Sequence, residues 1–162
     1  MNFFEKGVAL VKLALLYPLN AFAKKKLLSV QEKFGGRLRL AVSGAGALPD
    51  FLDTWIDAIG IRIVNAYGMT ECAPAIAGRA LNCNTFSTIG LPIKDTILKI
   101  VDKEGNQLPA GEEGDIWLKG EQITSGYYNN PEENAKSFSA DGFFKTGDLG
   151  KLTIRGELII TG

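Results

Sequence analysis

The sequence contains no histidine and only two cysteines, Cys72 and Cys83, among its 162 residues. Within this chain there is therefore no imidazole for a zinc site or a Ser/His pair, and two cysteines make neither a disulfide framework nor a metal cluster. Charge of one sign is also missing, since 18 basic residues balance 18 acidic ones. A role that depends on attraction to nucleic acid or anionic lipid is disfavoured.

A long uninterrupted apolar run is missing as well. The most apolar stretch, residues 8–22, is broken by Lys12 and Pro18 and falls short of the roughly 20 apolar residues that span a bilayer. Three lysines follow it at 24–26, whereas in a signal peptide they would precede it. We predict an amphipathic or buried helix, with a membrane-surface helix and peripheral membrane contact as the alternative. The absence of a signal and the few cysteines favour a cytoplasmic location.

The first half of the chain has the pattern of a β-α-β unit. With 46% apolar residues, the chain can bury a core. Leu38, Leu40 and Val42 alternate with other residues, which predicts a strand, and a second strand is expected from Ile61. Between them, a helix is expected from Pro49 until Gly60, with one apolar stripe made of Phe51, Leu52, Trp55, Ile56 and Ile59. The two strands are expected to be parallel.

The second half, from about residue 86, has short apolar runs separated by turn residues. Strands are expected at 96–101, 114–119 and 151–161, a hairpin turn near 102–106, and a short helix that starts at Pro131. The predicted fold is therefore mixed α/β: a β-α-β unit of a larger sheet, followed by a small antiparallel β-barrel-like subdomain. We place the boundaries at 1–36 (lead-in helical segment), 37–85 and 86–162.

A dense polar cluster follows the second strand, at Asn65-Ala66-Tyr67-Gly68-Met69-Thr70-Glu71. A tyrosine ring can stack on a purine, and Gly68 allows close backbone approach to a ligand. Thr70 can donate to a phosphate oxygen, and the carboxylate of Glu71 is a suitable magnesium ligand. The alternative is a strand end with a capped turn.

Two further segments are weaker candidates. The turn at Ser43–Leu48 could present amides to a nucleotide, or it could simply pack a helix against a strand. Asp148 is expected between glycine-flanked turns. Its two oxygens match the two hydroxyls of a ribose, and an ordinary turn aspartate is the alternative.

Taken together and in this order, the segments resemble the adenylate-forming superfamily of acyl-CoA synthetases, peptide-synthetase adenylation domains and luciferases. The resemblance covers most of residues 37–162. It rests on the segments SGAGAL, YGMTE (Tyr67 to Glu71), TIGLP, GDIWLKG, GYYNNPE, FKTGDLG and GELIITG.

The resemblance implies a role for each matching residue. Tyr67 corresponds to the adenine-stacking aromatic, Thr70 to the hydroxyl that faces the reacting phosphate, Glu71 to the magnesium ligand and Asp148 to the ribose-binding carboxylate. The turn whose backbone lies beside the adenine and the acyl group matches Gly44, Ala45 and Gly46. A further adenine contact matches Asn65.

The implied reaction has two halves. A carboxylate attacks the α-phosphate of ATP to give acyl-AMP and pyrophosphate, and a thiol, that of CoA, then attacks the mixed anhydride to give a thioester. ATP, Mg²⁺ and CoA are the implied cofactors, and a fatty acid is the expected acid. Catalysis would consist mainly of positioning and charge stabilisation.

Some parts of the family pattern have no counterpart in this sequence. Nothing before residue 37 resembles the family's phosphate loop with its lysine, and the pattern would continue beyond Gly162 into an arginine, a hinge and a small domain with a catalytic lysine. We therefore expect the C-terminal part of the family's large domain, inactive alone and prone to self-association. Two rival functions stay open: an amino-acid or aryl-acid adenylating domain, and a non-catalytic module that binds nucleotide or a partner.

Overall fold

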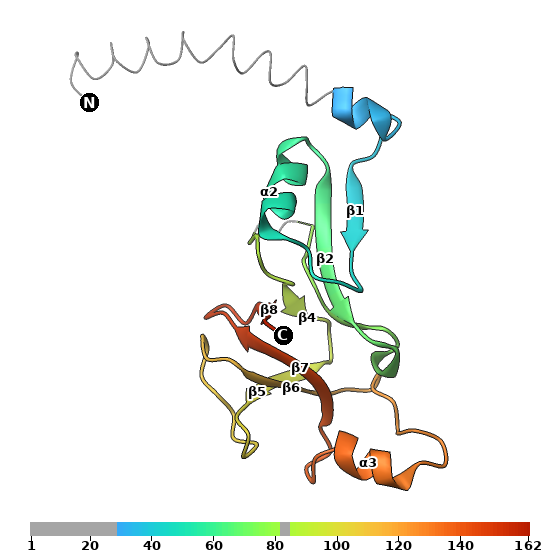
Figure 1. Cartoon of the computed structure of the whole chain (residues 1–162), viewed down its shortest axis with the longest axis vertical. Coiled ribbons are helices and arrows are strands. Elements are labelled where there is room, and N and C mark those ends of the chain that lie inside the picture. Colours follow the sequence, from blue (N-terminus) through green and yellow to red (C-terminus); the bar gives the residue numbers. More distant parts are fainter. Residues whose placement is uncertain (1–28, 82–84) are drawn as a thin grey trace, which may run out of the picture.

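The computed structural model describes residues 29–81 and 85–162 (Figure 1). The helix expected at residues 8–22, with its membrane-surface alternative, lies outside this part of the chain. No helix in the described ranges combines the length and the apolar character needed to cross a bilayer.

The predicted β-α-β unit is confirmed. Strand β1 (Leu40–Ser43), helix α2 (Asp50–Ala58) and strand β2 (Arg62–Gly68) follow one another, and β1 pairs with β2 in parallel, Leu40 opposite Arg62 and Ser43 opposite Asn65. Acidic Asp50 and Asp53 lie in the first turn of α2, where they complement the helix dipole. The polar cluster lies at the carboxyl end of β2, which is an interior strand of its sheet.

The apolar stripe predicted for α2 is only partly buried, with Ile59 at 5% exposure as its most buried member. Phe51 is 70% exposed and Trp55 49%, whereas Asp53 is only 2% exposed. The physical reason is the ion pair of Asp53 with Arg79, which turns this carboxylate inward. Periodicity alone could not show this, because the partner of Asp53 lies in a different segment.

Strands β3 (Ala75–Gly78) and β4 (Leu91–Pro92) extend the first sheet in the order β1-β2-β3-β4 and were not predicted. Both pairings, β2 with β3 and β3 with β4, are antiparallel. A short 3-10 helix, η1 (Thr70–Cys72), connects β2 to β3. These strands are too short, and too rich in small residues, to show a period of two.

The second sheet has the predicted antiparallel arrangement. Its order is β5 (Ile97–Val101), β6 (Gly114–Lys119), β7 (Phe144–Leu152) and β8 (Leu158–Ile160). The strand expected at 151–161 is instead the end of β7, a turn, and β8. Helix α3 (Pro131–Ser137) begins as predicted, with the Asn130 side chain accepting a hydrogen bond from the Glu133 amide.

One core joins the two sheets. A pair of backbone hydrogen bonds connects Leu158 of β8 to the segment just before β4: the Ile89 amide donates to the Leu158 carbonyl and the Leu158 amide to the Gly90 carbonyl. The core itself is formed by fully or nearly fully buried residues of both sheets and of η1: Cys72, Ile76, Ala77, Ile100, Ile116, Leu118 and Leu158. Strand β8 is therefore fixed against the first sheet. The boundaries expected after residues 36 and 85 stay predictions.

Candidate adenylate site

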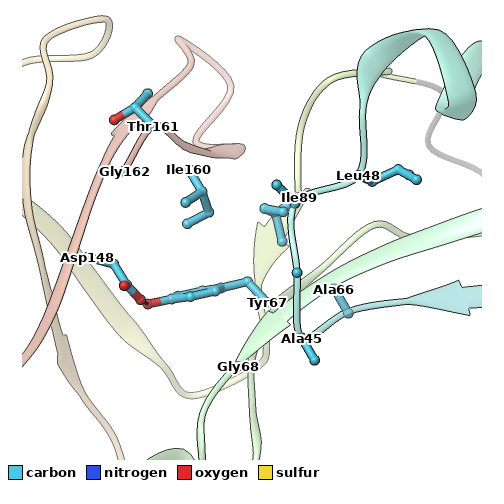
Figure 2. Close-up of a pocket in the computed structure, with 12 residues that line it drawn as sticks. Ala45, Leu48, Ala66, Tyr67, Gly68, Ile89, Asp148, Ile160, Thr161 and Gly162 are labelled. Atoms are coloured by element: carbon cyan, nitrogen blue, oxygen red, sulfur yellow. Dashed lines mark hydrogen bonds between the residues drawn. The ribbon is translucent and has the colours of Figure 1, made fainter.

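A pocket of about 450 Å³ lies between the end of β2, the turn after β1, and strands β7 and β8 (Figure 2). Its walls are mostly small or aliphatic, and its polar side chains are Tyr67 of β2, Asp148 of β7 and Thr161 just after β8. The lining consists of Ala45, Gly46, Ala47, Leu48, Ala66, Tyr67, Gly68, Ile89, Asp148, Ile160, Thr161 and Gly162.

Tyr67 and Asp148 meet inside this pocket. The phenol of Tyr67 donates a hydrogen bond to Oδ2 of Asp148, and Figure 2 shows the ring extending from β2 towards the carboxylate on the opposite strand. Burial, then the hydrogen bond and the negative charge of Asp148, raise the pKa of Tyr67 well above its ordinary value. The phenol therefore stays protonated and remains a donor at neutral pH.

Asp148 lies within strand β7, so the expected position between glycine-flanked turns is wrong, and so is the alternative of an ordinary turn aspartate. A β-bulge explains why the sequence looked like a turn. On β6, Asp115 and Trp117 are two residues apart, but their partners on β7, Leu149 and Lys145, are four apart. Gly147, with a φ of 82°, takes up the extra length, and such a bulge can redirect the neighbouring side chain.

The bulge is held by Thr146. Its Oγ1 donates to the Ile116 carbonyl at 3.0 Å and accepts from the Asp148 amide at 3.1 Å. Asp148 thus has a fixed backbone and one carboxylate oxygen bound to Tyr67. Among the described residues no group hydrogen-bonds to its other oxygen, Oδ1.

The turn after β1 supplies a second wall. Ala45 and Gly46 line the pocket, and Ala45 adopts a positive φ of 64°. Gly44 does not line it; a Cβ on Gly44 would lie 3.3 Å from the Ala66 carbonyl, so this residue packs against β2. In this turn, Ala45 and Gly46 therefore face the pocket, whereas Gly44 packs against the neighbouring strand.

The remaining candidates lie outside the lining. Asn65 is 7% exposed, and its carbonyl accepts a hydrogen bond from the Arg79 amide at 2.9 Å. Thr70 is exposed at the start of η1, and Glu71 is half-buried in the same turn. The structure therefore brings Ala45, Gly46, Tyr67, Gly68 and Asp148 together. Gly44, Asn65, Thr70 and Glu71 are placed around that group.

Within the described residues, the Glu71 carboxylate has one oxygen engaged in a hydrogen bond and one without a partner. Oε1 accepts a hydrogen bond of 2.8 Å from the Tyr127 phenol, and within the described ranges Oε2 accepts none. The described residues contain no group of three or more acidic, cysteine or histidine side chains around a common centre. Mg²⁺ commonly uses one or two carboxylates plus waters and substrate phosphates. A single carboxylate with one free oxygen fits that mode of binding.

Sequence reasoning missed several residues of this region. Tyr127 lies in the GYYNNPE segment that carried the family resemblance, so its position was available but its contact with Glu71 was not. Ile89, Ile160 and Thr161 line the pocket but carry no sequence signal that separates them from ordinary strand residues.

Comparison with known proteins identifies the class of protein. The family model described as AMP-binding enzyme matches residues 9–128. The probable chloroplastic acyl-activating enzyme 16 of Arabidopsis thaliana is 40% identical over 139 residues, which cover 85% of this chain and 19% of that protein. A long-chain-fatty-acid–CoA ligase of Haemophilus influenzae is 38% identical over 114 residues, 69% of this chain and 20% of that protein.

A solved structure gives the same result. ATP-bound MatB from Rhodopseudomonas palustris matches with a TM-score of 0.75 at 32% identity, over 82% of this chain and 26% of that one. The chain belongs to the AMP-binding, adenylate-forming enzymes, as the motifs predicted. It spans about a fifth of the length of the curated relatives it matches, 19% and 20% for the two above.

Proposed function

We propose that this chain supplies the adenylate-binding pocket of an AMP-forming ligase that activates a fatty acid as acyl-AMP and transfers the acyl group to CoA. The observation that carries the proposal is the Tyr67–Asp148 contact inside a pocket walled by a small-residue turn. An aromatic ring and a carboxylate in contact within one pocket suit the two parts of one nucleoside. The ring can stack on the base, and the carboxylate can accept hydrogen bonds from the ribose.

The pocket's own groups support these assignments. The Tyr67 ring offers a stacking surface, with Ala45 and Gly46 small enough to admit a flat base beside it. Ile89 and Ile160 exclude water from the apolar walls, which is typical of cofactor sites. The free Oδ1 of Asp148 would accept from a ribose hydroxyl, and Tyr67 holds the same carboxylate in place.

Thr70 and Glu71 would act on the phosphates. They follow Gly68, a pocket-lining residue, by two and three positions, so a nucleotide seated on Tyr67 could direct its phosphates towards η1. The Thr70 hydroxyl would donate to a phosphate oxygen, and Glu71 would hold Mg²⁺. The cation would neutralise charge on the α-phosphate and the departing pyrophosphate.

In this proposal the acid needs no general base. Its carboxylate oxygen attacks the α-phosphorus, the bond to the bridging oxygen breaks, and pyrophosphate leaves. The CoA thiol then attacks the acyl carbon, loses its proton, and AMP leaves with the bonding pair. We propose a cytoplasmic setting and a fatty acid as the substrate; the acid is suggested by relatives that are named long-chain-fatty-acid–CoA ligases.

Acid-dependent pyrophosphate release tests the substrate. The full-length gene product that carries this sequence would be assayed with ATP and Mg²⁺ plus hexadecanoate, acetate, malonate or anthranilate. We expect release with hexadecanoate that exceeds the others, and no release from the 162-residue chain alone. Release that is fastest with malonate or anthranilate would contradict a fatty acid substrate but would leave the adenylate site intact.

A further inference from the structure

The GYYNNPE segment is tied directly to Glu71. The phenol of Tyr127 donates to Oε1 of Glu71 at 2.8 Å, across 56 positions of the sequence. A second bond runs beside it, from the Thr124 amide to the Glu71 backbone carbonyl at 2.7 Å. Side chain and backbone of Glu71 are thus both held by residues 124–127.

That segment is itself anchored to helix α3. The side-chain amide of Asn134 forms two hydrogen bonds with the backbone of Tyr127: it accepts from the Tyr127 amide at 2.7 Å and donates to the Tyr127 carbonyl at 2.9 Å. Gly126 passes so close to this amide that a Cβ there would lie 2.9 Å from Asn134 Oδ1, and its φ is 132°. The backbone from which the Tyr127 side chain extends is therefore fixed in position.

The next residue shows the contrast. Tyr128 has the same side chain but is 99% exposed. In the described part of the chain its phenol hydrogen-bonds to neither Glu71 nor Asn134. Two adjacent tyrosines, of which only one reaches the carboxylate, provide a matched pair for experiment.

We infer that Tyr127 is a positioning residue that orients the Glu71 carboxylate for a divalent cation. The phenol engages Oε1 and so restricts rotation of the carboxylate, which leaves Oε2 as the oxygen that can bind the cation. Asn134 acts indirectly, because it fixes the Tyr127 backbone that carries the phenol. The inference rests on the proposed function, which makes Glu71 the magnesium ligand, and adds the residues that set its geometry. Groups that orient a metal ligand commonly change metal affinity by about tenfold or more.

Nucleotide binding with and without Mg²⁺ tests the inference without requiring turnover. The ATP affinity of the chain is measured by calorimetry, with no acid present, in saturating Mg²⁺ and in chelator. The readout is the ratio of the two affinities, compared among wild type, Tyr127→Phe, Asn134→Ala, Glu71→Gln and the control Tyr128→Phe. Far-UV circular dichroism checks that each variant is folded.

We expect Glu71→Gln to abolish the Mg²⁺ enhancement and Tyr127→Phe to reduce it about tenfold, with ATP affinity in chelator unchanged. Asn134→Ala should reduce it in the same direction, and Tyr128→Phe should match wild type. A Tyr127→Phe variant that keeps the full enhancement while Glu71→Gln loses it would overturn the inference and leave the proposed function standing. No Mg²⁺ enhancement in wild type, or none lost in Glu71→Gln, would overturn both.

Discussion

Arg79 and Asp53 form a buried ion pair with two parallel hydrogen bonds: Nη1 to Oδ1 and Nη2 to Oδ2 are both 2.7 Å, and the side chains are 1% and 3% exposed. Arg79 Nη2 also donates to the Thr88 carbonyl at 2.7 Å, and Asp53 accepts from the Ser87 amide at 3.3 Å. The pair thus connects α2 to the segment that leads into β4.

Removal of one partner should be strongly destabilising. Asp53→Ala leaves the Arg79 charge buried without its counterion, so we expect the free energy of unfolding to fall by about 3–5 kcal/mol. Urea unfolding followed by circular dichroism measures the change. The control is Asp57→Ala, which breaks the half-exposed pair with Arg62 and should cost at most about 1 kcal/mol. Equal losses in the two variants would contradict the structural role of the Asp53–Arg79 pair.

The main elements of the fold could be predicted from the sequence, whereas the contacts between distant side chains could not. The parallel β1-β2 pair and the antiparallel second half followed from periodicity and turn residues, and Asn130-Pro131 identified the start of α3. The Asp53–Arg79 pair could not be predicted, because it depends on side chains brought together by packing. Gly147 suggested a turn at Asp148, whereas it forms a bulge within β7, and only the pairing of β6 with β7 distinguishes these structures.

Alkaline pH should destabilise the fold through Tyr67. The raised pKa means that the folded state keeps the phenolic proton at a pH where the unfolded chain loses it, so the stabilisation is complete below about pH 10 and decreases as pH rises further. The slope for one such group approaches about 1.4 kcal/mol per pH unit. Burial raises the pKa of Cys72 to about 11, and this thiol contributes with the same sign.

Substitution of Tyr67 separates its contribution to the pH dependence of stability from that of Cys72. Urea unfolding between pH 8 and 11 should show a shallower loss of stability for Tyr67→Phe than for wild type, since Cys72 is present in both. Tyr128→Phe, which removes a fully accessible phenol, should follow the wild-type curve. Parallel curves for wild type and Tyr67→Phe would mean that Tyr67 is not buried against Asp148.

A methyl group added at Gly68 should lower the stability of the fold, whereas one added at Gly46 should affect nucleotide binding alone. A Cβ on Gly68 would lie 1.9 Å from the Pro74 carbonyl oxygen, so Gly68→Ala must displace the turn around η1, at a cost of about 3 kcal/mol in unfolding free energy. Gly46 has open space around it. Gly46→Ala should therefore unfold like wild type but bind a nucleotide more weakly, because the added methyl group narrows the pocket.

Exposed apolar side chains predict self-association. Val42 on the edge strand β1 is 71% exposed and Phe51 on α2 70%. Sedimentation velocity should show a concentration-dependent increase in mass, reduced in a Val42→Lys, Phe51→Lys double variant. A strict monomer at high concentration would refute this prediction.

Titration of the chain with an acyl-sulfamoyl adenosine, followed by amide chemical shifts, tests the adenylate site most directly. The account predicts saturable shifts at residues 44–46, 65–71 and 148, a loss of affinity of tenfold or more in Tyr67→Ala from lost stacking, on the order of 1–3 kcal/mol, and a similar loss in Asp148→Ala. Tyr67→Phe, which keeps the ring, should lose less. Binding that is unaffected by both alanine variants, or shifts confined to another surface of a folded chain, would contradict the assignment of this pocket to the adenylate.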